Sequence, residues 1–299
     1  MNTFFIHNPH KAENTTRADT MQKLMPKRVE KTFQGSKDTD TLTRRSLSLF
    51  TGTVLRTLIA CILSFLLFPV QSGIISVFFL SFALIPSMDH ILEKNKSDVW
   101  QKKIPSLRAN IEMAAALIVI FLAVLASYAA IVMFTLKSDQ IGIVFFSHIH
   151  DTMTHTHLVT KDFAAILKNR YTIFVVFFLV SLVYRVGFVF VLTWLASVWG
   201  VIYGMYFRLG FTLDQPSLKH HMIVITVSGF FVLLIRTLAL ITSGMSGIFL
   251  SKALGKYKFA SSEFKQVLRA VLLILLVSLV LLFAAVCLEF KILNPAFGD

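Results

Sequence analysis

Apolar runs of about 20 residues or more recur along this chain from Leu49 onward, and their length limits what it can fold into. A β-strand rarely exceeds about 10 residues, whereas an α-helix needs about 20 to cross the hydrocarbon core of a bilayer. The composition agrees, because 56% of the residues are hydrophobic and 15% are charged, against roughly 45–50% and about 25% in soluble domains. The sequence therefore predicts an all-α fold, a polytopic transmembrane helix bundle.

The first apolar run, Leu49 to Ile85, contains a turn signal near its middle. Pro69 and Gly73 flank a short polar stretch, Gln71-Ser72, and this combination is typical of a tight turn. We therefore expect a helical hairpin, with one span near 50–68 and another near 73–88.

The apolar run 171–207 is too long for one ordinary span, and Arg185 and Gly187 interrupt it. It is expected to form either two short helices or one long helix with a membrane-embedded half-helix. The sequence thus predicts six or seven spans in total. The remaining spans are expected near 111–136, 221–250 and 267–288.

Polarity divides the chain into three parts. Residues 1–48 form a polar, basic segment that has no apolar core of a signal peptide. Residues 49–290 form the transmembrane domain, and residues 291–299 form a short tail.

Lys and Arg residues concentrate in the N-terminal segment, in the 89–108 connector and in the 252–265 junction. Basic segments flank membrane spans mainly on the cytoplasmic side. We therefore expect a multi-pass protein of the cell (plasma) membrane with a cytoplasmic N-terminus and with the polar loop 137–170 outside.

The net charge of +13 raises the question of a nucleic-acid partner. The basic residues lie mainly beside apolar runs, where they match the bilayer surface, so the expected partner is the lipid bilayer and no nucleic acid. The two cysteines, Cys61 and Cys287, lie within apolar runs and are interpreted as small hydrophobic residues. The sequence indicates no oligomeric state.

Several stretches resemble the stage II sporulation protein M family, in its archaeal-type integral membrane form. Asn8-Pro9-His10-Lys11-Ala12-Glu13 resembles the opening Asn-Pro-x-Lys-Ala-Glu of that family, and Leu192 to Gly200 resembles its Leu-Thr-Trp-Asn-Ala-Ser-Val-x-Gly run. Ser243 to Gly247 resembles its Gly-Gly-Leu-Ala-Gly element, and Glu263 to Glu289 its last helix. The positions that carry the resemblance are Asn169, Trp194, Ser197, Gly200, Gly244, Gly247 and Glu289.

The chain departs from the family at one motif. The family commonly has His-Gly-x-x-Glu before its late small-residue helix, where this chain has Val232-Leu233 and Arg236. The resemblance implies a non-catalytic role without a cofactor, since the familiar members recruit cell-wall hydrolases during engulfment. It therefore implies a membrane scaffold that recruits cell-envelope protein partners.

The segment 148–157 carries paired histidines. Residues two apart on an extended chain point to one side, so each His-x-His pair can offer two imidazoles to one metal ion, with an Asp as an oxygen ligand. A solvated polar loop and a pH-responsive loop are the alternatives. The candidate ligands are His148, His150, Asp151, His155 and His157.

Two arginines, Arg185 and Arg236, interrupt otherwise apolar runs. A guanidinium at mid-bilayer costs about 2.5–3.5 kcal/mol on insertion scales, so it either faces the bundle interior or snorkels to an interface. We expect both to approach one region of the bundle and to bind a lipid phosphate, a span-end carboxylate or a solute. Tyr184 and Thr193 are expected beside them in a polar cavity if the chain is a transporter.

The sequence contains no phosphate-binding loop, dinucleotide-binding, nucleophile-elbow or His-Glu-x-x-His pattern, so no enzyme is expected. The scaffold that the family resemblance implies is the first function predicted. The alternative is a permease or transporter of a lipid or small anionic solute, because two overlong apolar runs, each interrupted by Arg and Gly, are typical of discontinuous helices around a midplane site.

Overall fold

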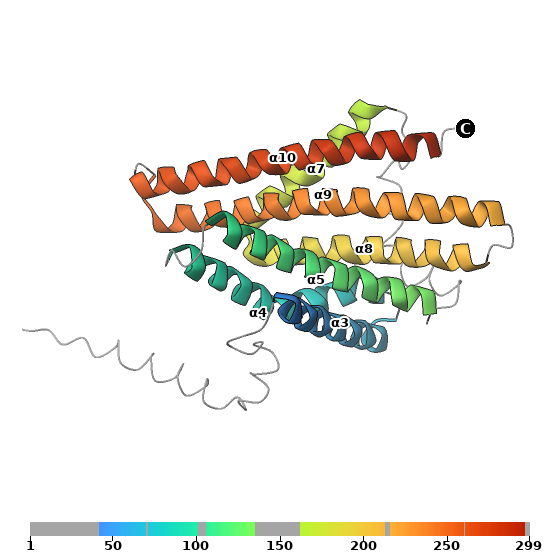
Figure 1. Ribbon diagram of the computed structural model, residues 1–299. Coiled ribbons are helices and arrows are strands. Elements are labelled where there is room, and N and C mark those ends of the chain that lie inside the picture. Colours follow the sequence, from blue (N-terminus) through green and yellow to red (C-terminus); the bar gives the residue numbers. More distant parts are fainter. Residues whose placement is uncertain are drawn as a thin grey trace, which may run out of the picture. The chain divides into compact units, whose positions relative to one another are not determined.

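The computed structural model describes residues 42–69, 71–100, 106–134, 162–212, 216–259 and 261–296. The chain divides into two units, Met1–Ser48 and Leu49–Asp299, and the helix bundle belongs to the second. All regular structure in the described part is α-helical (Figure 1). The helices are α3 (Leu42–Leu67), α4 (Ser72–Trp100), α5 (Ser106–Phe134), α7 (Phe163–Val183), α8 (Arg185–Thr212), α9 (Pro216–Lys256) and α10 (Ser262–Ala296).

Within the described residues, 7 helices are long and apolar enough to cross a membrane. The predicted all-α polytopic bundle is therefore confirmed, with the higher of the two expected span counts. The uncertain run 171–207 is divided between two full-length helices, α7 and α8, and not between a long helix and a half-helix. A single non-helical residue, Tyr184, links them, and its backbone N–H closes α7 by donating to the carbonyl of Val180.

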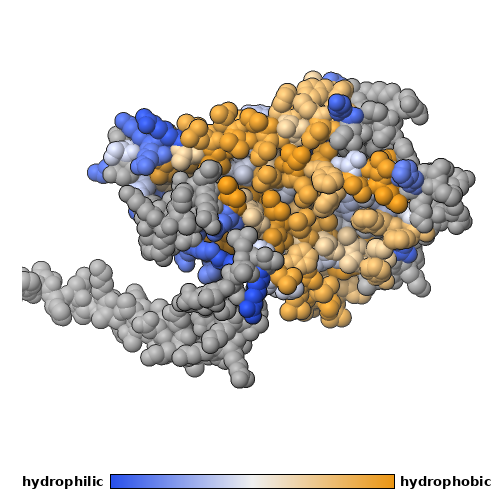
Figure 2. All heavy atoms as spheres, viewed as in Figure 1, coloured by the Kyte–Doolittle hydropathy of each residue, from blue (hydrophilic) through white to orange (hydrophobic). Residues whose placement is uncertain are grey.

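The surface of the bundle carries large apolar side chains that no other part of the structure covers. Leu66 on α3 is 72% exposed and Leu273 on α10 is 64% exposed. Figure 2 shows a broad apolar belt on this surface, with hydrophilic residues toward both of its ends and the larger group on the left. Monomeric soluble proteins rarely expose contiguous apolar patches larger than a few hundred Å², so this surface fits lipid as its solvent.

Helices α5 and α8 approach each other through glycines. A Cβ on Gly200 of α8 would lie 2.6 Å from the carbonyl oxygen of Leu125, and a Cβ on Gly204 would lie 2.8 Å from that of Ala129. Only a residue without a side chain permits this approach, which is the small-residue packing that membrane helices use.

Helix α9 uses two glycines in the same way against the α7–α8 corner. A Cβ on Gly244 would lie 2.3 Å from the ring of Phe188 and 2.8 Å from that of Phe177. A Cβ on Gly247 would lie 2.7 Å from the carbonyl oxygen of Phe178. The rings of Phe177 and Phe188 meet edge to face at 5.3 Å, so the chain reverses at Tyr184 and both helices pack on α9.

Hydroxyl pairs add polar links between helices. Ser76 on α4 and Tyr128 on α5 lie 2.6 Å apart, and Ser81 on α4 and Thr193 on α8 lie 2.7 Å apart. Such interhelical hydrogen bonds contribute roughly 0.6 to 2 kcal/mol each in membrane bundles. In the described part, two buried hydroxyls on α9, those of Thr237 and Ser243, have no hydrogen-bond partner.

Candidate functional site: a buried arginine–glutamate cluster

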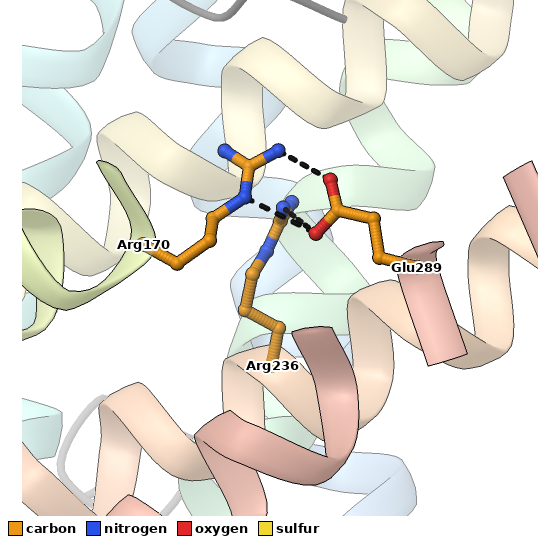
Figure 3. Close-up of polar contacts among 3 residues, drawn as sticks. All are labelled: Arg170, Arg236 and Glu289. Atoms are coloured by element: carbon orange, nitrogen blue, oxygen red, sulfur yellow. Dashed lines mark hydrogen bonds and ion pairs between the residues drawn. The ribbon is translucent and has the colours of Figure 1, made fainter. Parts of the chain in front are cut away.

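Three helices of the bundle each contribute one charged side chain to a single cluster (Figure 3). Arg170 of α7 donates from Nε to Oε2 of Glu289 on α10 at 3.1 Å, and from Nη2 to the other carboxylate oxygen. Arg236 of α9 places Nη1 3.7 Å from Oε2 of the same carboxylate. Figure 3 shows both guanidinium groups pointing at the one carboxylate. Arg170, Arg236 and Glu289 are called the arginine–glutamate cluster below.

The cluster is largely removed from solvent. The side chains of Arg170, Arg236 and Glu289 are 7%, 8% and 12% exposed. Ionised side chains are rarely buried unless they are paired, because desolvation of a charge is costly. A site that keeps three ionisable groups this deep in the bundle is therefore a candidate functional site.

Helix α8 closes the cluster with aromatic rings. The guanidinium carbon of Arg236 lies 4.7 Å from the centroid of Trp199, which is within cation–π range. Tyr203, one turn further along α8, is 4% exposed and its ring lies 6.1 Å from that of Trp199. The face of the Trp199 ring therefore lies against the guanidinium of Arg236.

Local structure explains how α7 places Arg170 in the cluster. The side chain of Asp162 accepts a hydrogen bond from the backbone N–H of Ala164, so Asp162 caps the helix before Phe163. Arg170 then lies two helical turns inside α7, where it is buried together with Phe174 and Phe177 on the same helix face. At this same end of α7, the ring of Phe163 lies 5.5 Å from that of Phe290 and packs α7 against α10.

The described side chains of the cluster carry two positive charges and one negative charge. A guanidinium has five N–H donors in a planar fork, which matches the oxygen pairs of carboxylates and phosphates. Two such forks around one carboxylate leave an excess charge of +1 among the described residues of the site. The arrangement has the chemistry that binding an anion requires.

The structure brings together some of the residues singled out from the sequence. Arg236 is buried beside Glu289, which is the span-end carboxylate among the three anionic groups expected for it. Arg185 begins α8, and about 21 Å of helix rise separates it from Trp199, the residue that stacks on Arg236. The side chain of Arg185 lies outside the described part. The binding of an external anion by these arginines stays a prediction.

Tyr184 and Thr193 do not accompany Arg236 in one site. Tyr184 is 68% exposed at the corner between α7 and α8. Thr193 is buried, and its hydroxyl pairs with Ser81 and donates to the carbonyl of Val189. Tyr184, Thr193 and Arg236, which are expected together in one polar cavity, therefore lie in three places: the α7–α8 corner, the contact with Ser81 and the arginine–glutamate cluster.

Among the positions that resemble the sporulation family, the three glycines have packing roles. Gly200, Gly244 and Gly247 lie at the close helix contacts described above. The hydroxyl of Ser197 donates to the carbonyl of the half-buried Trp194. Asn169 directly precedes Arg170 on α7 and is half-buried.

The predicted metal ligands fall outside the described residues. His148, His150, Asp151, His155 and His157 all lie within 135–161, and that prediction stays open. In the parts of the chain that the structure describes, no group of three or more His, Cys, Asp or Glu residues could hold a metal ion.

Sequence reasoning missed Arg170 and Arg56. Arg170 was placed in the polar loop 137–170, although α7 starts at Phe163. The signal for this helix is Asp162 as an N-cap before Phe163-Ala164-Ala165-Ile166-Leu167. Arg56 lies inside the first apolar span, where its Nη1 donates to the hydroxyl of Ser87 on α4 at 2.8 Å.

Comparison with known proteins adds nothing to this site. No protein-family model, curated protein or solved structure matches this chain. The resemblance to the stage II sporulation protein M family therefore stays a prediction, and the geometry of the arginine–glutamate cluster is the basis for a functional proposal.

Proposed function

We propose that this chain is a multi-pass membrane protein that binds an oxyanion at the arginine–glutamate cluster, as a permease for a small anionic solute or an anionic lipid. One observation carries the proposal: two buried guanidinium groups, on α7 and α9, share one carboxylate from α10. The proposal assigns no chemical reaction to the protein and no cofactor.

The physical argument is a balance of charges. An excess buried positive charge is unfavourable in a low-dielectric interior, so the site attracts anions. Arg236 is positioned for such an anion, because its contact with Glu289 is an ion pair at 3.7 Å, beyond hydrogen-bond distance. Carboxylates and phosphates have the oxygen geometry that an arginine fork binds with two parallel hydrogen bonds.

Among the functions that such a site can have, transport best fits the helices that surround the cluster. The cluster joins three membrane-spanning helices, and a ligand that changes their pairing changes their packing. Ionisable residues inside membrane spans commonly mark ion and substrate pathways. The same chemistry would hold a soluble oxyanion or the phosphate of a lipid headgroup, and the experiment below separates these two sources.

The test is ligand-dependent stability of the purified full chain in phosphatidylcholine nanodiscs. Inorganic phosphate and acetate are added as soluble probes, and phosphatidylglycerol is added to the nanodisc as the lipid probe. A ligand at 100 times its Kd stabilises the folded state by about 2.7 kcal/mol. We expect at least one probe to raise the unfolding temperature of the wild type, and the responding probe identifies the source of the anion.

Variants show whether the rise in unfolding temperature depends on Arg236. In Arg236→Gln the stabilisation is expected to disappear, whereas Arg269→Gln, an exposed arginine on α10, keeps it. Arg236→Lys keeps the charge but loses the fork, so it is expected to respond weakly and serves where the glutamine variant is too unstable to purify. A wild type that responds to none of the probes, or an Arg236→Gln variant that responds like the wild type, contradicts the proposal.

A membrane scaffold is the second candidate. It is favoured by the close packing of α8 on α5 and of α9 on the α7–α8 corner, because glycine contacts to backbone atoms define a rigid bundle. A scaffold is expected to bind a cell-envelope protein equally well in the wild type and in Arg236→Gln. A co-purifying partner that the arginine variant loses would favour the anion site instead.

We further propose that the N-terminus is cytoplasmic in the cell membrane and that the loop 137–170 lies outside, because basic residues concentrate in 1–48, 89–108 and 252–265. The test replaces Cys61 and Cys287 by Ala and introduces Ser36→Cys or Thr152→Cys. An impermeant thiol reagent on intact cells is expected to label position 152 and not 36, and the reverse result contradicts this orientation.

A further inference from the structure

We propose that Glu289 is a tethered counter-anion, which occupies the arginine site in the absence of ligand and is exchanged for the incoming oxyanion. This inference rests on the proposed function, because it concerns the ligand and regulation of the same site. It assigns Glu289 the role of a competitor of the ligand, and not of a group that helps to bind it.

The first support is that the two arginines differ in the hydrogen bonds they make. Arg170 uses its Nε and Nη2 edge in two hydrogen bonds to both oxygens of Glu289. Arg236 makes no hydrogen bond to any described residue, and its partners there are Oε2 of Glu289 at 3.7 Å and the face of Trp199. Arg236 therefore keeps N–H donors unused beside a carboxylate that is already engaged by the other arginine.

The second support is the chemistry of the present occupant. A carboxylate fills the fork of Arg170, so this fork accepts a pair of oxygens attached to one central atom. The ligand class that follows is an oxyanion with at least two equivalent oxygens, such as a carboxylate or a phosphate monoester. Such a ligand can bridge Arg170 and Arg236 when Glu289 withdraws.

The third support is charge. Two arginines with Glu289 carry +1, and adding a monoanion while Glu289 remains in contact would place two anions side by side. Like charges at close range in a low-dielectric site repel strongly. Exchange avoids this repulsion, because the ligand takes the contacts that the carboxylate gives up.

Exchange also changes how the helices are joined. Glu289 is the side chain of α10 that pairs with α7 and α9 in the cluster. Withdrawal of Glu289 releases α10 from Arg170, while a bridging ligand ties α7 to α9. Ligand binding and the packing of α10 are thereby coupled at one carboxylate.

The experiment compares the affinity of the full chain in phosphatidylcholine nanodiscs for inorganic phosphate and for acetate in the wild type and in Glu289→Gln. Removing the competing charge is expected to tighten binding of at least one probe roughly tenfold or more, since pairs of close buried charges have large coupling energies. Glu289→Asp keeps the charge on a shorter side chain and is expected to bind with intermediate affinity. Glu93→Gln, an exposed acid on α4, is the matched control and keeps the wild-type affinity.

The outcomes are separable. Tighter binding in Glu289→Gln supports the tethered counter-anion, and so does binding that appears only in that variant. Equal or weaker binding in Glu289→Gln, with the wild type still binding, overturns this inference and leaves the proposed anion site in place. Absence of phosphate and acetate binding in both proteins overturns this inference, and it overturns the proposed function as well when phosphatidylglycerol also leaves the unfolding temperature of the wild type unchanged. If Glu289→Gln cannot be purified, the affinity of Glu289→Asp relative to the wild type decides in the same sense.

Discussion

The α5–α8 contact and the arginine–glutamate cluster hold helices together by different means. At Gly200 the backbone of α8 meets the carbonyl of Leu125 with no side chain between them, and the fit is one of shape. At Glu289 three helices meet through long charged side chains, and the fit is one of charge. A shape contact has one arrangement, whereas a charged cluster has partners that can be exchanged. The comparison places rigidity in one region and, under the proposed function, recognition in the other.

The largest effect is expected from converting the charged region step by step into an apolar one. Glu289→Leu alone leaves two buried guanidinium groups without their carboxylate, which is expected to lower the free energy of unfolding by about 3–5 kcal/mol. The triple variant Arg170→Met, Arg236→Met, Glu289→Leu removes all charges and is expected to regain most of that loss. Chemical or thermal unfolding in nanodiscs measures both. A triple variant no more stable than Glu289→Leu would show that the cluster is needed for the fold itself.

Adding a single methyl group at Gly200 tests the α5–α8 contact. Gly200→Ala places a Cβ 2.6 Å from the backbone oxygen of Leu125, so the helices must separate, at about 1–3 kcal/mol. Gly210→Ala on the same helix meets nothing within 4 Å and is the matched control. The control is expected to be neutral or up to about 1 kcal/mol more stable, because Ala is the better helix former. Equal unfolding temperatures for Gly200→Ala and Gly210→Ala would show that the α5–α8 contact does not depend on its close fit, and the contrast with the charged cluster would be lost.

The smallest change in stability is expected from replacing buried hydroxyls, and its sign depends on whether the hydroxyl has a hydrogen-bond partner on another helix. Thr193→Val removes the hydrogen bond to Ser81 and leaves that buried partner with its own backbone bond, which is expected to cost about 1 kcal/mol. Thr237→Val removes a buried hydroxyl that has no partner in the described structure, and it is expected to stabilise the protein by a similar amount. The difference in unfolding temperature between the two variants is the measurement, and its sign is the prediction.

The spans could be predicted from the sequence because each depends on local composition. The turn expected at Pro69 to Gly73 is where α3 ends and α4 begins. The break at Tyr184 lies beside Arg185 and Gly187, where an interruption is predicted, but the sequence left two alternatives open because the corner depends on Phe177 packing against Phe188. The contact between Arg170 and Glu289 joins residues 119 positions apart, and hydropathy carries no information on such pairs.

The arginines illustrate the same limit at a finer scale. Arg236 stood out because uncharged residues surround it for many positions, but Arg170 follows Lys168 and Asn169 and resembled the end of a loop. In the structure its helix starts two turns earlier, so the residue lies inside the bundle. Burial of a charge is decided by the neighbouring helices, and these are set by tertiary packing.

The length of α9 has a consequence for the membrane around the protein. Its mainly apolar stretch 223–250, before the basic junction that begins at Lys252, has 28 residues, which is about 42 Å of helix against a hydrocarbon thickness of about 30 Å. Tilt alone would have to reach about 44°, whereas membrane helices tilt by about 0–40°. Part of this stretch therefore extends into the headgroup layer or draws lipid up around it. The protein carries a built-in hydrophobic mismatch, and bilayers of greater thickness are expected to hold it with less deformation.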